Sequence, residues 1–372
     1  MRRGRDLHDL GMIEDGSVLI RDGTVAAVGS TRRIENLKEA RDALEIPANG
    51  RVVMPAFVDP SLNLSVKKTA NSAPDSQNSK KLSQFYDESI ALLRSCLLHG
   101  TLTAEIRADG GGSDFHSDIA VLRRLAKIGN NPIEVVRTWR INQIPQDDSF
   151  PEFCETLAKL LRRKWAQFIE LPSEMDEVAN ERLLQTLEET SLGIKLRWLG
   201  GSPDILASLV SRMSPRAVAC PTYLSSPECS VLSNSESIAV FAPAKRVFEA
   251  APATCARRVA DGGGAIALCT EYDFKHPASS SMQMALSSAV LRLKLTVEEA
   301  ITASTINAAH AAGCAKTTGS LETTKQANAL LLNVADYREI PRQFGINHVD
   351  MAIRNGNIVF SRTHWKMSAP NR

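Results

Sequence analysis

No stretch of this sequence approaches the roughly 18 consecutive apolar residues that a membrane-spanning helix requires. The basic segment at its start, MRRGRDLHDL, also lacks the apolar stretch of a secretory signal. We therefore expect a cytoplasmic protein that has no membrane as a partner.

The sequence also lacks a block of one charge. Lys and Arg number 44 against 42 Asp and Glu, a formal net charge of +2, and the basic residues are spread along the chain. Proteins that bind nucleic acid usually gather Lys and Arg in one region. We expect no nucleic-acid partner.

Paired cysteines are missing as well. Seven Cys are scattered along the 372 residues, and no two of them form a C-x-x-C pair. Disulfide frameworks and zinc knuckles depend on such spacings, so neither is indicated. We expect most of these side chains to be buried, reduced thiols.

Hairpin signals stand near both ends of the chain. Asp22-Gly23 joins two short apolar runs in SVLIRDGTVAAVG (17–29), and Asn355-Gly356 does the same in VDMAIRNGNIVFS (349–361). Both dipeptides favour the type I′ turn of a two-residue hairpin. We predict a composite β-domain from residues 1–54 and 321–372, a small β-sandwich.

Between these hairpins, short apolar runs alternate with longer segments of helical period. Eight such units in one series predict an α/β fold, a TIM-like (β/α)8 barrel over residues 55–320, with a doubly wound sheet as the alternative. The strand candidates are residues 52–58, 101–107, 133–139, 166–171, 193–199, 216–220, 237–242 and 265–270.

Other segments are expected to connect or follow the strands. The polar segment 66–81, rich in Ser, Asn and Lys, reads as a loop over the barrel mouth. Residues 81–100 and 176–193 end in Gly, the usual stop signal of a helix. Two further helices are expected at 282–293 and 297–313.

Chemistry in such barrels lies at the carboxyl ends of the strands. The side chains there are Ser61, Asn63, Glu105, Arg107, Arg140, Glu170, Arg197, Cys220 and Glu271. None of them is a His. Cys220 is either a buried small side chain or a nucleophile, and Ser61 and Asn63 are more typical of turns and hydrogen bonds than of catalysis.

Several stretches resemble a known family. They are PAFVDP (55–60), EEAITASTINAAHAAG (298–313), GSLETTKQA (319–327) and DYREIPRQFGINHVDMAIRNGNIVF (336–360). They look like the metal-dependent amidohydrolase superfamily, and within it the imidazolonepropionases, which open an imidazolone ring in histidine degradation. The resemblance implies a hydrolase of non-peptide C–N bonds, zinc or iron as cofactor, and a homodimer.

The resemblance also locates the family's metal ligands in this chain. Ser61 and Asn63 stand where the family has His-x-His, Arg197 and Cys220 stand where it has His, and Glu271 stands where it has Asp. Zinc needs about three ligands from Cys, His and carboxylate. Only Cys220 and Glu271 qualify, so we expect no bound metal.

Two functions remain open. The first is a catalytically degenerate relative, a pseudoenzyme whose barrel mouth keeps a small-molecule ligand contacted by Ser61, Asn63, Glu105 and Arg107. The second is an active hydrolase of a cyclic amide or other C–N bond, with a metal-free site of Glu271, Arg197 and Cys220. In either case, we hypothesise that Arg197 pairs with Glu271 across the barrel mouth.

Overall fold

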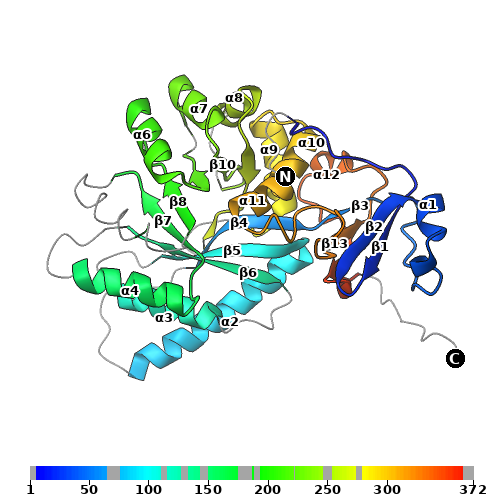
Figure 1. The fold of residues 1–372 in the computed structure, drawn as a ribbon, viewed down its shortest axis with the longest axis horizontal. Helices are drawn as coiled ribbons and strands as arrows, with labels where there is room; N and C mark the ends of the chain where they lie inside the picture. Colours follow the sequence, from blue (N-terminus) through cyan, green and yellow to red (C-terminus); the bar gives the residue numbers. More distant parts are fainter. Residues whose placement is uncertain are drawn as a thin grey trace.

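Parallel strands and helices alternate through the middle of the chain, as the sequence predicts (Figure 1). The computed structural model describes residues 6–64, 76–109, 115–126, 133–142, 150–174, 187, 193–221, 223–245, 254–273 and 279–362. Within these residues, one sheet has the strand order β11-β10-β9-β8-β7-β6-β5-β4-β12. Its strands are β4 (Phe57–Leu64), β5 (Thr101–Asp109), β6 (Glu134–Arg140), β7 (Phe168–Pro172), β8 (Gly193–Arg197), β9 (Ala217–Ala219), β10 (Ile238–Phe241), β11 (Ile266–Leu268) and β12 (Tyr272–Asp273).

The eighth strand, which is interrupted in the middle, closes this sheet into a barrel. β11 and β12 are two parts of one strand, and β12 pairs in parallel with β4, placing Tyr272 opposite Leu62. The other side of β4 pairs with β5, so the ring is complete. Glu271 lies in this interruption with a φ of 46°, in the left-handed region that residues other than glycine rarely adopt. The predicted TIM-like barrel is confirmed.

Helices cover the outside of the barrel (Figure 1). None of the described helices combines the length and apolar character that crossing a bilayer requires. Those of the barrel are α2 (Ser76–Leu98), α3 (Phe115–Ala126), α4 (Phe150–Arg162), α6 (Pro203–Met213), α7 (Ser226–Ser233), α8 (Cys255–Asp261), α9 (Met282–Arg292), α10 (Val297–Ser304) and α11 (Ile306–Ala311).

Strand side chains alternate between two cores. On β5, for example, Leu102 and Ile106 point outward into the apolar layer beneath the helices. A second apolar cluster fills the amino-terminal end of the barrel, where Phe168 and Ile238 pack with the alanines of α11. α11 therefore plugs this end, and an opening into the barrel is left at the carboxyl end.

The two ends of the chain meet in a β-domain, as predicted. β1 (Gly16–Arg21) and β2 (Thr24–Ser30) form one hairpin, and a second sheet has the order β15-β14-β13-β3. Asp22-Gly23 and Asn355-Gly356 all have positive φ, as a type I′ turn requires. The remaining elements of this region are β3 (Val53–Pro55), β13 (Ala329–Leu332), β14 (Val349–Arg354), β15 (Asn357–Ser361), α1 (Thr31–Glu35) and α12 (Glu339–Arg342).

Three sequence predictions need correction. The apolar run 52–58 is not one barrel strand, because β3 joins the terminal sheet and the barrel strand β4 starts at Phe57. The segment 66–81 is not all loop, since α2 begins at Ser76. The helix expected at 297–313 is divided at Thr305, whose φ and ψ of −123° and −94° are not helical. Residues 65–75 and nearly all of the expected helix 176–193 lie outside the described residues.

Candidate functional site

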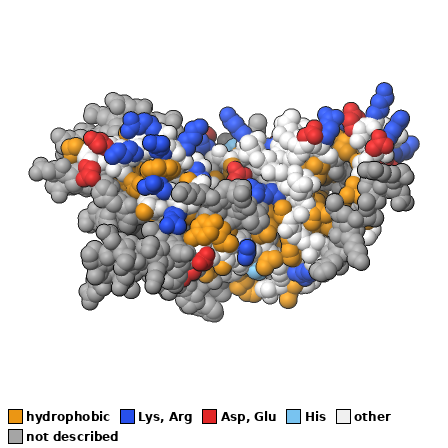
Figure 2. Space-filling model, turned by 90° about the horizontal axis from the view of Figure 1, so that it is seen from below, with side chains coloured by type: hydrophobic (Ala, Val, Ile, Leu, Met, Phe, Trp, Pro, Cys, Tyr) orange, Lys and Arg blue, Asp and Glu red, His pale blue; other side chains and the backbone are white. Residues whose placement is uncertain are grey.

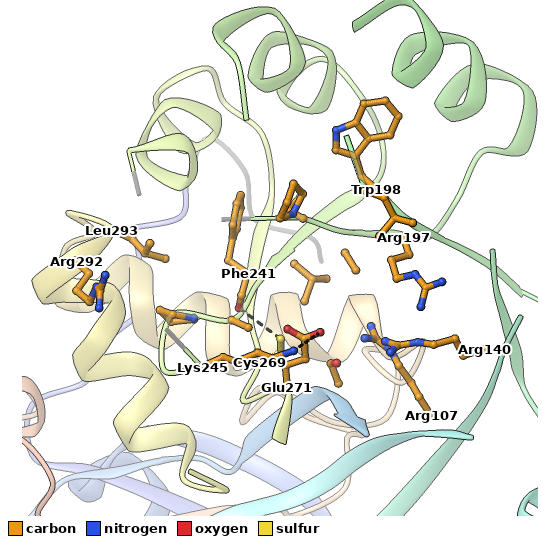
Figure 3. Close-up of a pocket in the computed structure, with 18 residues that line it drawn as sticks. Arg107, Arg140, Arg197, Trp198, Phe241, Lys245, Cys269, Glu271, Arg292 and Leu293 are labelled. Carbon is orange, nitrogen blue, oxygen red and sulfur yellow. Dashed lines mark hydrogen bonds and ion pairs between the residues drawn. The ribbon is translucent and has the colours of Figure 1, made fainter. Parts of the chain in front are cut away.

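A cavity of about 310 Å³ opens at the carboxyl ends of the barrel strands, where the sequence places the candidate residues (Figure 3). Its volume is at the lower end of the range for small-molecule pockets. The cavity is lined by Ser61, Arg107, Arg140, Arg197, Trp198, Leu199, Ala219, Cys220, Pro221, Val240, Phe241, Ala242, Pro243, Lys245, Cys269, Glu271, Arg292 and Leu293.

Three arginines form one wall of the cavity. Arg140 and Arg197 end strands β6 and β8, and Arg107 lies two residues before the end of β5. Figure 3 shows the three guanidinium groups together on one side. Behind them, the Glu170 carboxylate lies 2.8 Å from Arg107 Nε and 2.7 Å from Arg140 Nε. Burial raises the pKa of Glu170, but these two arginines, together with Arg197 and Lys195, outweigh burial and lower it to about 2. Glu170 is therefore ionised at neutral pH and offsets one of the positive charges.

A second buried ion pair lies deeper in the barrel. Lys195 pairs with Glu105, which also accepts a 2.7 Å hydrogen bond from Thr138 Oγ1. The Lys195 ammonium lies 4.4 Å from the centre of the Phe168 ring. Burial lowers the pKa of Lys195, and the Glu105 carboxylate opposes that shift. Glu105 therefore serves as the partner of Lys195, and it is not among the described residues that line the cavity.

Glu271 faces the arginine wall from the opposite side of the cavity, as Figure 3 shows. Its carboxylate lies 3.2 Å from Nζ of Lys245, in the turn that follows β10. Arg197 instead donates a 2.9 Å hydrogen bond from Nη2 to Asn142 Oδ1. The predicted Arg197–Glu271 ion pair is wrong. β10 is the neighbour of β11, whereas β8 is two strands further round the barrel, so Lys245 is the nearer cation.

Asp59 anchors the seam between the first and last strands. It is buried on β4, and its carboxylate accepts hydrogen bonds from the backbone N–H groups of Ser61 (3.1 Å) and Thr270 (3.2 Å) and from Thr270 Oγ1 (2.5 Å). Burial raises its pKa to about 7, although these hydrogen bonds act in the other direction. Asp59 thus fixes Ser61, which lines the cavity, and Thr270, which directly precedes the lining residue Glu271.

Ser61 and Asn63 lie on the same strand but have different surroundings. Ser61 lines the cavity, and its buried hydroxyl makes no hydrogen bond to any described residue. Asn63 is buried beside Asp273 of β12 and does not belong to the cavity lining.

Cys220 belongs to the apolar side of the cavity. Its thiol donates to the Val218 carbonyl oxygen at 3.4 Å, and burial raises its pKa well above the ordinary value. A nucleophilic Cys needs a lowered pKa or a base beside it. No His is among the described residues that line the cavity. This geometry favours the interpretation of Cys220 as a small, protonated wall residue.

The structure brings six of the nine strand-end candidates to one cavity and adds residues that sequence reasoning missed. The six are Ser61, Arg107, Arg140, Arg197, Cys220 and Glu271. Lys245, Trp198 and Arg292 were missed. Lys245 follows the apolar run 237–242, so the same strand-end rule could have found it. Arg292 lies at the end of α9, and strand patterns carry no signal for it.

Comparisons with known proteins agree with the barrel fold. Residues 253–359 match the model of the Amidohydrolase family. The imidazolonepropionase of Parabacteroides distasonis is 26% identical over 96% of this chain and 94% of its own length, and that of Brevibacillus brevis is 27% identical over 96% and 92%. By these matches, this chain is imidazolonepropionase-like, and its carboxyl-terminal part resembles the Amidohydrolase family.

Solved structures with the same fold are more distant in sequence. Guanine deaminase of E. coli matches with a TM-score of 0.68 and 15% identity, over 94% of this chain and 93% of the other. The 5-methylcytosine deaminase of Klebsiella pneumoniae matches with a TM-score of 0.70 and 13% identity, over 93% and 95%. At this identity, the likeness shows that the imidazolonepropionase-like chain has their fold.

The zinc or iron of the superfamily does not fit the donors present. Ser61 offers a neutral hydroxyl, Cys220 keeps its proton, and Glu271 is already paired with Lys245. A guanidinium about 4 Å from a divalent ion costs roughly 8 kcal/mol at an effective dielectric of 20, and Arg197 lines this cavity. Among the residues that the structure describes, no three His, Cys, Asp or Glu side chains group closely enough to hold an ion.

Proposed function

We propose that this imidazolonepropionase-like protein is catalytically degenerate. It has lost metal-dependent hydrolysis and keeps the barrel cavity as a small-molecule binding site. The observation that carries the proposal is the pairing of Glu271 with Lys245 in a cavity whose other wall consists of Arg107, Arg140 and Arg197. Arg197 stands where the resemblance places a metal ligand, and Lys245 engages Glu271, which stands at another such position.

Charge explains why the two arrangements exclude each other. A divalent ion near Glu271 has to displace Lys245 and tolerate the guanidinium of Arg197. Hydrolysis also needs a group that removes a proton from water, such as a carboxylate or a neutral His. The Glu271 carboxylate is already engaged by the Lys245 ammonium group, so it is not free to take a proton from water.

The alternative is a metal-free hydrolase with Glu271, Arg197 and Cys220 in its site. Attack by Cys220 requires a thiolate, and burial disfavours that form. Glu271 and Arg197 also have different partners, because Glu271 pairs with Lys245 and Arg197 donates to Asn142. We therefore rank this alternative second.

Two measurements on one purified sample test the proposal. The first is the zinc and iron content after growth with both metals, and the second is imidazolone-ring hydrolysis over a range of enzyme concentrations. The Brevibacillus brevis relative, prepared in parallel, is the positive control. We expect substoichiometric metal and no turnover above background. Stoichiometric metal together with turnover would overturn the proposal, and turnover without metal would support the alternative.

We further propose that the protein acts in the cytoplasm as a homodimer. The resemblance to the imidazolonepropionases supports this proposal. Light scattering after gel filtration should give twice the 40.5 kDa mass of the chain, and a monomer mass would contradict it.

A further inference from the structure

We infer that the barrel cavity binds a small organic anion, a carboxylate or phosphate ester with an apolar body, whose oxygens are held by Arg107, Arg197 and Ser61. The inference deepens the proposed function, on which it rests, by naming the ligand class. It reverses the usual charge of this part of the barrel, since an anion would occupy the end of the cavity where a metal hydrolase holds a cation.

The charge of the cavity lining is the first observation. Among its described residues, five carry positive charge and one carries negative charge. Adding Glu170, which lies directly behind the arginines, still leaves five against two. The chain as a whole differs, because its 44 Lys and Arg nearly balance its 42 Asp and Glu, and on the face in Figure 2 both kinds of charged side chain are visible. The positive excess is therefore a local property of the cavity, and it favours an anionic occupant.

Hydrogen-bond donors that face the cavity are the second observation. Arg107 contacts Glu170 and Glu105 through Nε, at 2.8 and 3.9 Å, which leaves its two terminal nitrogens for a ligand in the cavity that it lines. Ser61 is fully buried, lines the cavity, and its hydroxyl has no hydrogen-bond partner among the described residues. A buried hydroxyl without a partner is unfavourable. An oxyanion between the two groups accepts from both, and the planar guanidinium suits carboxylate and phosphate.

Apolar side chains in the cavity lining indicate what the rest of the ligand is like. Trp198, Val240, Phe241 and Leu293 give the cavity an apolar side. Trp198 is fixed there, because its indole Nε1 donates a 2.6 Å hydrogen bond to Glu228. Apolar walls with a few placed polar groups are typical of small-molecule sites. The occupant therefore carries an aromatic or aliphatic body beside its charged group.

Glu271 and Arg197 allow a test of the inference, because removing one or the other charge should change anion binding in opposite directions. Its carboxylate is the one negative group among the described lining residues, and its field reaches Arg107, whose pKa it helps to raise. A bound anion has to share the cavity with this charge. Removing the charge should strengthen anion binding, whereas removing Arg197 should weaken it. Damage to the fold would weaken binding in both variants.

Calorimetric titration at constant ionic strength tests the inference with three probes: inorganic phosphate, phenylacetate and phenylacetamide. The last has the same body as phenylacetate without its charge. We expect phenylacetate to bind at least about tenfold more tightly than phenylacetamide, because the charged form gains charge-assisted hydrogen bonds. Phosphate tests whether the anion site works without the apolar body.

Three variants complete the experiment. Arg197→Gln should bind phenylacetate about tenfold more weakly, and Glu271→Gln should bind it more tightly. Arg342→Gln removes an exposed Arg of α12 outside the cavity, and it should bind like the unmodified protein. Equal affinity for phenylacetate and phenylacetamide, or equal loss in Arg197→Gln and Arg342→Gln, would overturn the inference. That failure, without metal or turnover, would leave the proposed function intact.

Discussion

In both halves of the barrel interior, alternate side chains of each strand point inward, but they are charged in one half and apolar in the other. From β5 to β8 the inward side chains include Glu105, Arg107, Glu170 and Lys195, all buried. From β9 to β11 they are small and apolar, and they pack on α11. The backbone geometry therefore determines which side chains contact one another inside the barrel. The sequence determines, separately for each half, whether those contacts are ion pairs or apolar contacts.

The comparison has an energetic side. Apolar side chains gain free energy simply by leaving water, whereas buried ions must recover a desolvation cost through their partners. The charged half is therefore sensitive to the loss of one partner, and the apolar half is sensitive to lost volume. Four substitutions separate these two kinds of sensitivity.

The largest effect is expected for Glu170→Gln. It leaves Arg107 and Arg140 buried without their shared carboxylate. The free energy of unfolding should fall by about 3 to 5 kcal/mol, as measured by urea titration. Glu155→Gln is the matched control, because Glu155 is 72% exposed and its change should stay within about 0.5 kcal/mol. Equal losses in the two variants would contradict the assignment of Glu170 as the neutralising group.

Lys195→Met is expected to be next. It removes the partner of Glu105 but keeps the hydrogen bond from Thr138, so the free energy of unfolding should fall by about 3 kcal/mol. The double variant Lys195→Met/Glu105→Gln removes both charges and should recover most of this loss. Additive losses in the double variant would show that the two side chains contribute independently.

A pH titration compares the charged half with the seam. The pKa of Asp59 is raised to about 7, so its contribution to stability is complete below its unfolded value near 3.8 and is lost as pH rises through 7. The pKa of Glu170 is lowered to about 2, so its contribution is present above 4.5 and is lost as pH falls through 2. Asp59→Asn should remove a slope of up to about 1.4 kcal/mol per pH unit between pH 4 and 7. An unchanged slope in that variant would show that other groups cause it.

The smallest effect is expected in the apolar half. Ile238→Val removes one buried methylene beside α11 and should lower the free energy of unfolding by about 0.5 to 1.5 kcal/mol. The same urea titration measures it. A loss as large as that of Glu170→Gln would remove the distinction between the two halves.

The sequence was sufficient to predict the parts of the fold that depend on local patterns. Asp22-Gly23 and Asn355-Gly356 predict their turns because both residues of each pair tolerate positive φ. The order of the apolar runs favours a barrel over a doubly wound sheet. The division at Ala56 was missed, because both β3 and β4 are apolar and no turn residue separates them.

Prediction of the site was partial for a different reason. The strand-end rule found Arg107, Arg197 and Glu271, since it needs only the place where each strand stops. It could not choose their partners. Which cation reaches Glu271 depends on the spatial order of the strands and on the turn that holds Lys245, and this information exists only in the closed barrel.

The pairing of β3 with β13 also has a consequence for how the protein is made. Residues 53–55 leave the ribosome early, but their partners at 329–332 and the strands beside those follow only near the end of translation. Until then, the edge of β3 has no strand to join and is open to other chains. The β-domain can therefore assemble only once nearly the whole chain has been synthesised, and chains that stop before β13 should aggregate.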